Sequence, residues 1–494
     1  MPMRQNCTIH ACCAMLRALF SIMRTMSPLR DGEFTKLRQE KKETLIGDLT
    51  TGPVAKVLIR FAVPMVLANL LQTIYNMVDM VVVGQFVGKV GLSSVAIGAS
   101  LLQLMTFIAM GFCNAGQVII SQFVGAGDKK SVSRTIGTLF TIVLLSSLVF
   151  TVISSIGANT FLNLLNTPAE AFASAKAYCR VCFSGLFFIY GYNLVSAILR
   201  GMGDSRHPLM FIAIAAIINL ILDLVFVAVF KLGAFGAALA TVIGQAVSFI
   251  SSIVLLYKRR EAFNFDFKPE SFKIDGAILR RLLKLGIPLC LQNIAISFSM
   301  LFVSSFINAY GVVASAVTGI GDKLGVISAV IASSLSTSGS AMIGQCLGAG
   351  KTDRVPRVIR FAMLVNLSFA TILTLLTVLM PHRIFGLFNT DPDVLTMAMT
   401  YIPCAVLNYY GFALRSPVFS LINGVGHPSL NLTVGLLDGV ICRIGLALLL
   451  GIVAGIGVKG FWYGNICAGY VPFIIGGTYY LSGRWKTRKI LISR

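Results

Sequence analysis

The sequence predicts an all-α integral membrane protein with twelve transmembrane helices in two parallel, pseudo-symmetric six-helix bundles. Three observations predict this class. The 494-residue chain is 56% hydrophobic and only 12% charged, its basic residues gather in alternate loops, and its motifs recur at a nearly constant offset. Because so few charged residues cannot cover the surface of a water-soluble protein of this length, we expect most of the surface to face lipid.

The chain contains twelve apolar segments, each long enough to cross a bilayer, which takes about 20 residues. In chain order they cover 54–86, 93–123, 132–160, 172–199, 208–230, 234–257, 279–309, 313–346, 356–380, 394–422, 429–452 and 457–481. The first and seventh contain Pro64 and Pro288, which remove a helical hydrogen bond and predict a bend. The second and eighth are each followed by a Gly-Ala-Gly run and basic residues, which predicts a helix end.

These segments divide the chain into five parts. We expect an amino-terminal lobe over 49–257, a polar cytoplasmic linker over 258–278, a carboxy-terminal lobe over 279–481 and a basic cytoplasmic tail over 482–494. Residues 1–48 form an extension that is disordered or that precedes the true start of translation. Its short apolar run lacks a convincing signal-peptide cleavage site, so we assign it no function.

The net charge of +22 is explained by topology. Of the 41 basic residues, 32 lie in the extension, the tail, the even-numbered connections or the segment ends that adjoin them, and only six lie in or beside the odd-numbered connections. By the positive-inside rule both termini are expected in the cytoplasm, which an even number of spans satisfies. Because the charge follows the loops instead of gathering on one folded face, a nucleic-acid partner is not expected.

The two halves of the chain repeat each other at offsets of 220 to 224 residues. The repeated pairs are Pro64 and Pro288, Asn69 and Asn293, Gln122 and Gln345, the runs 125–127 and 348–350, Gly201 and Gly424, Gly203 and Gly426, and Pro208 and Pro428. Each half holds an even number of spans, so both point the same way. Parallel repeats of this kind leave a cleft that rocking exposes to either side in turn, which favours a carrier over a duplicated scaffold or a channel.

Ionisable residues inside the apolar segments are candidate functional groups, because a charge at the bilayer centre is costly. Asp79, Asp223, Asp322 and Asp438 are the acids in such segments. Asn219 precedes Asp223 by one helical turn, and Gln72 and Tyr75 precede Asp79 by about two turns and one turn, so each set shares a helix face. Carboxylate and amide oxygens predict a sodium site at Asp79, Asn219 and Asp223, or a proton held there by the buried acids.

The second half does not preserve this chemistry. Val303, Gly439 and Arg443 stand where the first half has Asp79, Asn219 and Asp223, so ion coupling is expected to be asymmetric. Arg443 follows Asp438 by five positions, and an ion pair between them requires a distorted helix. Arg415 suits either an anionic substrate contact or a structural ion pair, and the partners of Asp322 and Lys323 are not assigned. Weaker candidates for the substrate cleft are Asn69, Gln292, Asn293, Arg415 and Asp438.

Other chemistries are poorly supported by the sequence. The Gly-Ala-Gly runs do not continue into a phosphate-binding loop, so an ion gradient is the expected energy source and no cofactor is predicted. Cys179 and Cys182 have a metal-binding spacing, but no second pair completes a site. An intramembrane enzyme is disfavoured because His10, His207, His382 and His427 all lie outside the segment centres. The protein is therefore not expected to be an enzyme.

From about residue 50 onward the sequence resembles the multidrug and toxic compound extrusion (MATE) transporters, in particular the bacterial branch related to DNA-damage-inducible protein F. The resemblance rests on the order and spacing of Pro64 with Gln72, Tyr75 and Asp79, the 125–127 turn, the run 199–204, Asn219 with Asp223, and Thr241. It implies a cation site at Asp79, Asn219, Asp223 and Thr241. Where other branches place an acid in the seventh helix, this chain has Gln292 and Asn293.

The resemblance implies a secondary antiporter of a bacterial plasma membrane, monomeric and embedded in the lipid bilayer. It would export drug-like or cationic amphipathic small molecules in exchange for sodium ions or protons by alternating access. A flippase for lipid-linked or polysaccharide precursors is the alternative, although such relatives commonly have a more cationic cleft and additional helices. The identity of the substrate and the choice between sodium and proton are left open by the sequence.

Overall fold

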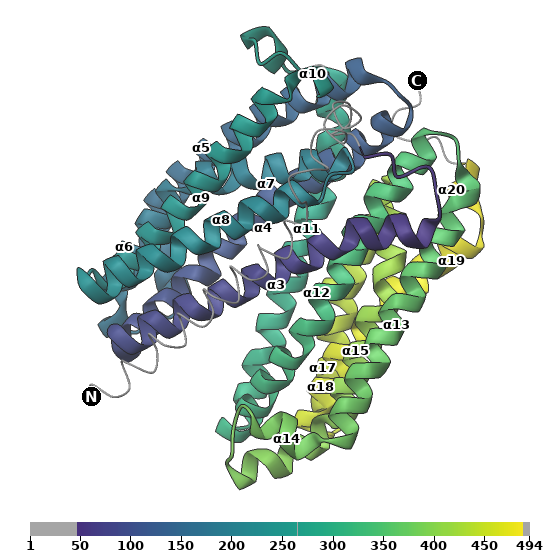
Figure 1. Ribbon diagram of the computed structural model, residues 1–494. Coiled ribbons are helices and arrows are strands. Elements are labelled where there is room, and N and C mark those ends of the chain that lie inside the picture. Colours follow the sequence, from purple (N-terminus) through teal and green to yellow (C-terminus); the bar gives the residue numbers. More distant parts are fainter. Residues whose placement is uncertain (1–46, 264, 488–494) are drawn as a thin grey trace, which may run out of the picture.

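The computed structural model describes residues 47–263 and 265–487, and these residues form helices and connecting turns without any strand. The extension up to residue 46 and the last seven residues of the predicted tail lie outside this range. The helices form two bundles (Figure 1), one from each half of the chain. The bundles meet at the end of the molecule where α10 and α20 lie, and diverge toward the end that carries α6 and α14.

The first half contains the six predicted spans. Its elements are α3 (Val54–Phe86), α4 (Gly88–Gly125), α5 (Lys129–Leu164), α6 (Ala169–Ser184), α7 (Leu186–Gly201), α8 (Arg206–Asp223), the π-helical η1 (Leu224–Val229) and α9 (Gly233–Lys258). The fourth predicted span is divided between α6 and α7, which are bent by 49°. The connection to the second half carries α10 (Arg260–Phe263) and η2 (Pro269–Phe272).

The second half of the chain contains the other six predicted spans. Its elements are α11 (Gly276–Asn308), α12 (Val312–Gly348), η3 (Thr352–Arg354), α13 (Val355–Leu379), α14 (Pro381–Gly386), α15 (Pro392–Val425), α16 (Pro428–Leu436), η4 (Leu437–Cys442), α17 (Arg443–Leu448), η5 (Leu449–Val453), α18 (Val458–Ala468), α19 (Val471–Leu481) and α20 (Arg484–Thr487). In the described chain nine helices are long and apolar enough to cross a membrane, and the α6–α7 pair makes a tenth. The twelve are completed by α15, which contains two prolines, and by the α18–α19 pair.

Several helices begin at an aspartate that caps them. The Asp128 carboxylate accepts hydrogen bonds from Ser131, from the backbone N–H at 3.0 Å and from Oγ at 2.6 Å, and α5 begins at the next residue. These bonds, that from the Ser131 hydroxyl first, lower the pKa of Asp128. Asp275 caps α11 in the same way through the N–H groups of Ala277 and Ile278. Such caps satisfy donors that have no partner within the helix.

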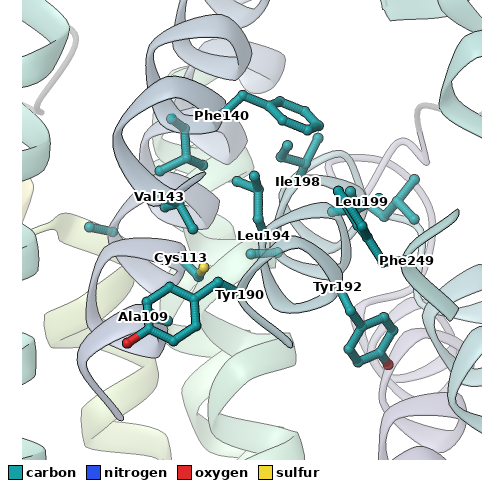
Figure 2. Packing of buried hydrophobic residues seen from close by; sticks show 14 of the residues in the cluster. Ala109, Cys113, Phe140, Val143, Tyr190, Tyr192, Leu194, Ile198, Leu199 and Phe249 are labelled. Carbon is teal, nitrogen blue, oxygen red and sulfur yellow. The ribbon is translucent and has the colours of Figure 1, made fainter. Parts of the chain in front are cut away.

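Apolar side chains both fill the bundles and cover them. In the first bundle Tyr190 and Leu194 of α7 pack between α4 and α5 (Figure 2), and the Tyr190 hydroxyl donates to the Met105 carbonyl at 2.7 Å. On the outside, Ile156 is 79% exposed and Val312 is 85% exposed. Such exposure is unfavourable in water but favourable against acyl chains, which supports the predicted lipid environment.

The first helix of each half crosses from one bundle to the other. Leu58, Phe61 and Met65, in the first part of α3, pack with buried residues of α12, α13 and α15, whereas Val82 and Val83 pack within the first bundle. The seventh span, α11, likewise starts in the opposite bundle and ends in its own. Leu282 to Leu289 belong to the core of the first bundle, and Val303 belongs to that of the second. Pro64 and Pro288 therefore lie where each helix passes between bundles.

The bundles are joined by a close contact between α4 and α12, which we call the basic-end seam and define as residues 117–125 and 337–348. The Gln122 side chain donates to the Gly424 carbonyl at 2.9 Å, and its repeat counterpart Gln345 donates to the Gly201 carbonyl at 3.3 Å. A Cβ at Gly125 would lie 2.0 Å from the Gln345 carbonyl oxygen, and one at Gly348 would lie 2.0 Å from that of Gln122. Glycine is therefore required at both positions for this approach.

Residues 47–52 form a strap across the basic-end seam. The Gly47 N–H donates to the Met202 carbonyl at 2.9 Å in the first half, and the Leu49 N–H donates to Gln345 Oε1 at 3.0 Å in the second. Lys351 Nζ then donates to Thr50 Oγ1 at 3.0 Å. The strap thus bonds to both bundles at the end where the basic connections lie.

Candidate functional site

Two buried acids of the first bundle lie next to each other. Asp79 lies toward the carboxy-terminal end of α3 and is 8% exposed. Asp223 is the last residue of α8 and is fully buried. Their carboxyl groups are within hydrogen-bonding reach of each other, and Oδ1 of each is buried without a hydrogen-bond partner in the described structure. Two carboxylates this close cannot both stay ionised unless a cation lies with them, so the site requires a proton or another cation.

Asn219 and Thr241 lie beside the two acids. Asn219 is one turn before Asp223 on α8, and α9 brings Thr241 alongside. The Asn219 side chain has two useful orientations. In one, Nδ2 donates to Thr241 Oγ1 at 3.4 Å and Oδ1 is directed toward the Asp223 carboxylate. In the other, Nδ2 donates to Asp223 Oδ2 and Oδ1 accepts from the Thr241 N–H, both at 3.2 Å.

A tyrosine lies between this group and α9. Tyr75, one turn before Asp79, lines a narrow pocket with Asn219, Thr241 and Gln245 of α9. Gln72 itself is exposed. Gln245 was not among the residues predicted from the sequence. Its spacing of one helical turn after Thr241 was the available signal, because the two share a helix face.

The structure thus brings Asp79, Asn219, Asp223, Thr241 and Tyr75 together, and it places the weaker cleft candidates elsewhere. Asn69 Nδ2 donates to Ser334 Oγ at 2.9 Å, so Asn69 joins α3 to α12. Gln292 is buried against Gly435 of α16, and Asn293, next to it on α11, is partly exposed. None of the three lies at the acid pair.

Asp438 and Arg443 form an ion pair inside the second bundle. Arg443 Nη2 lies 2.7 Å from Asp438 Oδ1, and Nη1 donates to Asn465 Oδ1 of α18 at 2.7 Å. The distortion that this pairing requires is present, because η4 is a π-helix, in which residues five apart share a face. Arg415 of α15 lies nearby with its guanidinium 4.2 Å from the centre of the Phe412 ring. Asp322 and Lys323, in contrast, are exposed on α12.

Breaking the Asp438–Arg443 pair is expected to destabilise the protein. Asp438→Asn leaves the Arg443 guanidinium without its carboxylate, and removing one partner of a buried pair costs about 3–5 kcal/mol. Thermal unfolding in detergent should show this loss, and Asp438→Met combined with Arg443→Met should recover most of it. Asp353→Asn is the matched control, because its exposed pair with Arg357 spans 4.0 Å and contributes about 1 kcal/mol or less. Equal stability of Asp438→Asn and the control would contradict a structural ion pair.

No group of three or more metal-binding side chains occurs within residues 47–263 and 265–487. Cys179 and Cys182 are buried free thiols on α6. The acid pair therefore offers oxygen ligands alone, the type that sodium prefers. Carboxyl, amide and hydroxyl oxygens come from Asp79, Asp223, Asn219 and Thr241, and the two unpartnered Oδ1 atoms make this donor set suitable for such an ion.

Comparisons with known proteins agree with this architecture. A family model described as MatE matches residues 64–225 and 288–458. The "Probable multidrug resistance protein YoeA" of Bacillus subtilis is 28% identical over 435 residues, which cover 87% of this chain and 94% of that protein. The "Probable multidrug resistance protein NorM" of Thermotoga maritima is 24% identical over 89% of this chain and 94% of that protein.

Solved structures show the same fold. A MOP superfamily transporter from Pyrococcus furiosus superposes with a TM-score of 0.82 at 21% identity, over 91% of this chain and all of that one. A structure described as MATE in the bent conformation superposes with a TM-score of 0.79 at 22% identity, over 90% of this chain and 99% of that one. Identities this low relate the folds alone. The predicted twelve-helix membrane architecture is confirmed.

Proposed function

We propose, because this chain belongs to the MatE family of multidrug efflux transporters, that it exports drug-like or cationic amphipathic compounds. Sodium ions or protons would move in exchange. The relatives are named as multidrug resistance proteins or transporters, so no catalytic reaction is assigned. The resistance proteins of Bacillus subtilis and Thermotoga maritima support multidrug substrates by their names. We place the protein in the cytoplasmic membrane of a bacterium.

The adjacent buried carboxyl groups of Asp79 and Asp223 carry this proposal. An ionised pair this close, remote from water, is unfavourable by several kcal/mol unless a cation accompanies it. A proton shared between the two oxygens, or a sodium ion held with Asn219 and Thr241, removes that penalty. The site therefore differs in energy between its loaded and empty forms, which is what an ion-driven transporter requires.

The position of Asp79 on α3 links the ion to the movement of the bundles. The same helix packs on the second bundle through Leu58 and Phe61, and it passes Pro64 before it reaches the acid pair. When Asp79 gains or loses charge, the path of α3 changes, and the contacts of α3 at the basic-end seam change with it. The transporter then has two states, one with a bent α3 and one with a straight α3. The coupling ion binds these two states with different affinity.

The orientation of the molecule follows from its basic residues. We place the basic-end seam and both termini on the cytoplasmic side, because 32 of the 41 basic residues are on that side. The seam is closed in this structure, so the bundles diverge toward the outside. Entry of substrate from the cytoplasm then requires the seam hydrogen bonds of Gln122 and Gln345 to break.

The Asn219 side chain provides a structural distinction between the two candidate ions. With Oδ1 directed toward the Asp223 carboxylate, the amide adds an oxygen ligand for sodium, while Nδ2 donates to Thr241 Oγ1 at 3.4 Å. With Nδ2 donating to Asp223, the amide stabilises a carboxylate and the pair needs only a shared proton. Asn219→Leu should therefore impair sodium coupling more severely than proton coupling.

Purified protein in liposomes tests the proposal directly. Sodium and pH gradients are imposed separately, and the flux of an organic cation such as ethidium is followed by fluorescence. We expect saturable transport that depends on one gradient and runs opposite to the ion. Flux that is unaffected by either gradient, or that occurs equally in protein-free liposomes, would refute ion-coupled export. Flux of a labelled phospholipid without flux of the cation would favour a flippase.

A further inference from the structure

The interior of the second bundle carries more positive than negative charge. Arg415 of α15 and Arg443 of α17 lie within electrostatic range of the single carboxylate of Asp438. Asp438 is fully buried and Arg443 is 5% exposed. The three side chains therefore hold one uncompensated positive charge at a depth where an isolated charge is costly.

The hydrogen bonds of this cluster are incomplete. Arg443 uses Nη1 and Nη2, but its Nε is buried without a partner, as is Asp438 Oδ2. Buried polar atoms in native proteins are nearly always paired, so two unpaired atoms within one buried ion pair indicate a missing group.

Arg415 is the accessible member of the cluster. It is half-buried, and within residues 47–263 and 265–487 it makes neither a hydrogen bond nor an ion pair that meets ordinary distances. Its guanidinium stacks on Phe412, which fixes the plane of the group. Gly469 lies next to it, since a Cβ there would be in van der Waals contact with Nη1 at 3.8 Å.

A guanidinium held in this way suits one chemical class of ligand, an anionic group with two oxygens. Its fork of N–H donors fits the two oxygens of a carboxylate or phosphate, and such charge-assisted pairs are strong where water is excluded. An anionic group at Arg415 would neutralise the excess charge. The free Oδ2 of Asp438 would then accept from an ammonium or hydroxyl group on the same molecule.

We propose that the second bundle contains a substrate subsite for a carboxylate or phosphate group, in which Arg415 makes the contact and the Asp438–Arg443 pair lies beside it. This inference rests on the proposed export function and extends its substrates from organic cations to zwitterions. The first bundle then binds the coupling ion and the second recognises the anionic part of the substrate. The asymmetry between Asp223 and its repeat counterpart Arg443 follows from this division.

A matched pair of dyes tests the subsite. Rhodamine 110 has a free carboxyl group, and rhodamine 123 is its methyl ester, so the two differ at the group in question. Binding to purified protein is measured by fluorescence polarisation in detergent without any ion gradient. Arg415→Met should raise the Kd of rhodamine 110 by about 10-fold or more, as for loss of a hydrogen bond to a charged group. The Kd of rhodamine 123 should change by about 3-fold or less, since that ester lacks the charge.

Arg415→Lys distinguishes a lost ligand contact from a structural effect of the substitution. Lysine keeps the charge but loses the planar fork, so an intermediate Kd for rhodamine 110 is expected, and this variant carries the test if Arg415→Met does not purify. The inference is overturned if wild-type protein fails to bind rhodamine 110, or if the substitution weakens both dyes by the same factor. Binding that depends on Arg415 without any gradient-driven flux in liposomes would instead overturn the proposed function and leave the subsite standing.

Discussion

Asp223→Asn is expected to abolish gradient-driven export while leaving folded protein in the membrane. Asparagine has nearly the same shape, but it cannot exchange a proton and contributes no charge to a cation. Coupling free energies of about 1–3 kcal/mol correspond to roughly 5–150-fold. We expect the export rate in liposomes to fall by roughly 100-fold, near the upper end of that range. Asp79→Asn should have the same effect, because both carboxyl groups contribute to one site.

Asp322→Asn is the matched control for these variants. It is an acid in a spanning helix, but it is exposed on α12 and distant in the fold from the acid pair, so its transport should stay near that of wild type. Protein abundance and size-exclusion behaviour are measured for all three. Near-normal export by both Asp79→Asn and Asp223→Asn would remove the acid pair from the mechanism, whatever the control shows.

A disulfide across the basic-end seam is expected to stop transport reversibly. A Cβ at Gly344 would lie 3.1 Å from the Ser121 Cβ, somewhat closer than the usual separation of about 3.8 Å in a disulfide. The double variant Ser121→Cys, Gly344→Cys should therefore crosslink on oxidation after a small relaxation. Because the proposed transport cycle requires the seam to open, flux should fall to the level of protein-free liposomes and return when a reductant is added.

The single variants are the controls for the crosslink. Ser121→Cys and Gly344→Cys each lack a partner across the seam, so oxidation should leave their flux unchanged. They also report any effect of oxidant on the cysteines already present, including the buried Cys113 and Cys346. Full transport by the crosslinked double variant would show that the seam stays closed throughout the cycle, which contradicts alternating access at this end.

The spans could be predicted from the sequence because long apolar runs have few alternatives in a membrane. The first segment, 54–86, coincides with α3. The bend between α6 and α7 at Gly185 was not predicted, since hydropathy measures length and not direction. The same limit applies to α3 and α11, whose apolar faces do not reveal which bundle they contact.

The candidate site was partly predictable for a similar reason. Helical spacing placed Asn219 with Asp223 and Tyr75 with Asp79, but only the packing of α3 against α8 brings the two acids together. Gln245 was missed because a lone glutamine in an apolar segment carries little signal. The Asp438–Arg443 pair required a π-helical turn, and residues five apart lie on different faces of the regular helix that spacing assumes.

The crossing of α3 and α11 between bundles has a consequence for the ancestry of the chain. A half-length precursor would bury the first part of its leading helix only against a second copy of itself, as Leu58 and Leu282 now do in opposite halves. Such a precursor would exist as a homodimer that exchanges leading helices. Fusion of the two genes would then have made permanent an exchange that the dimer already used.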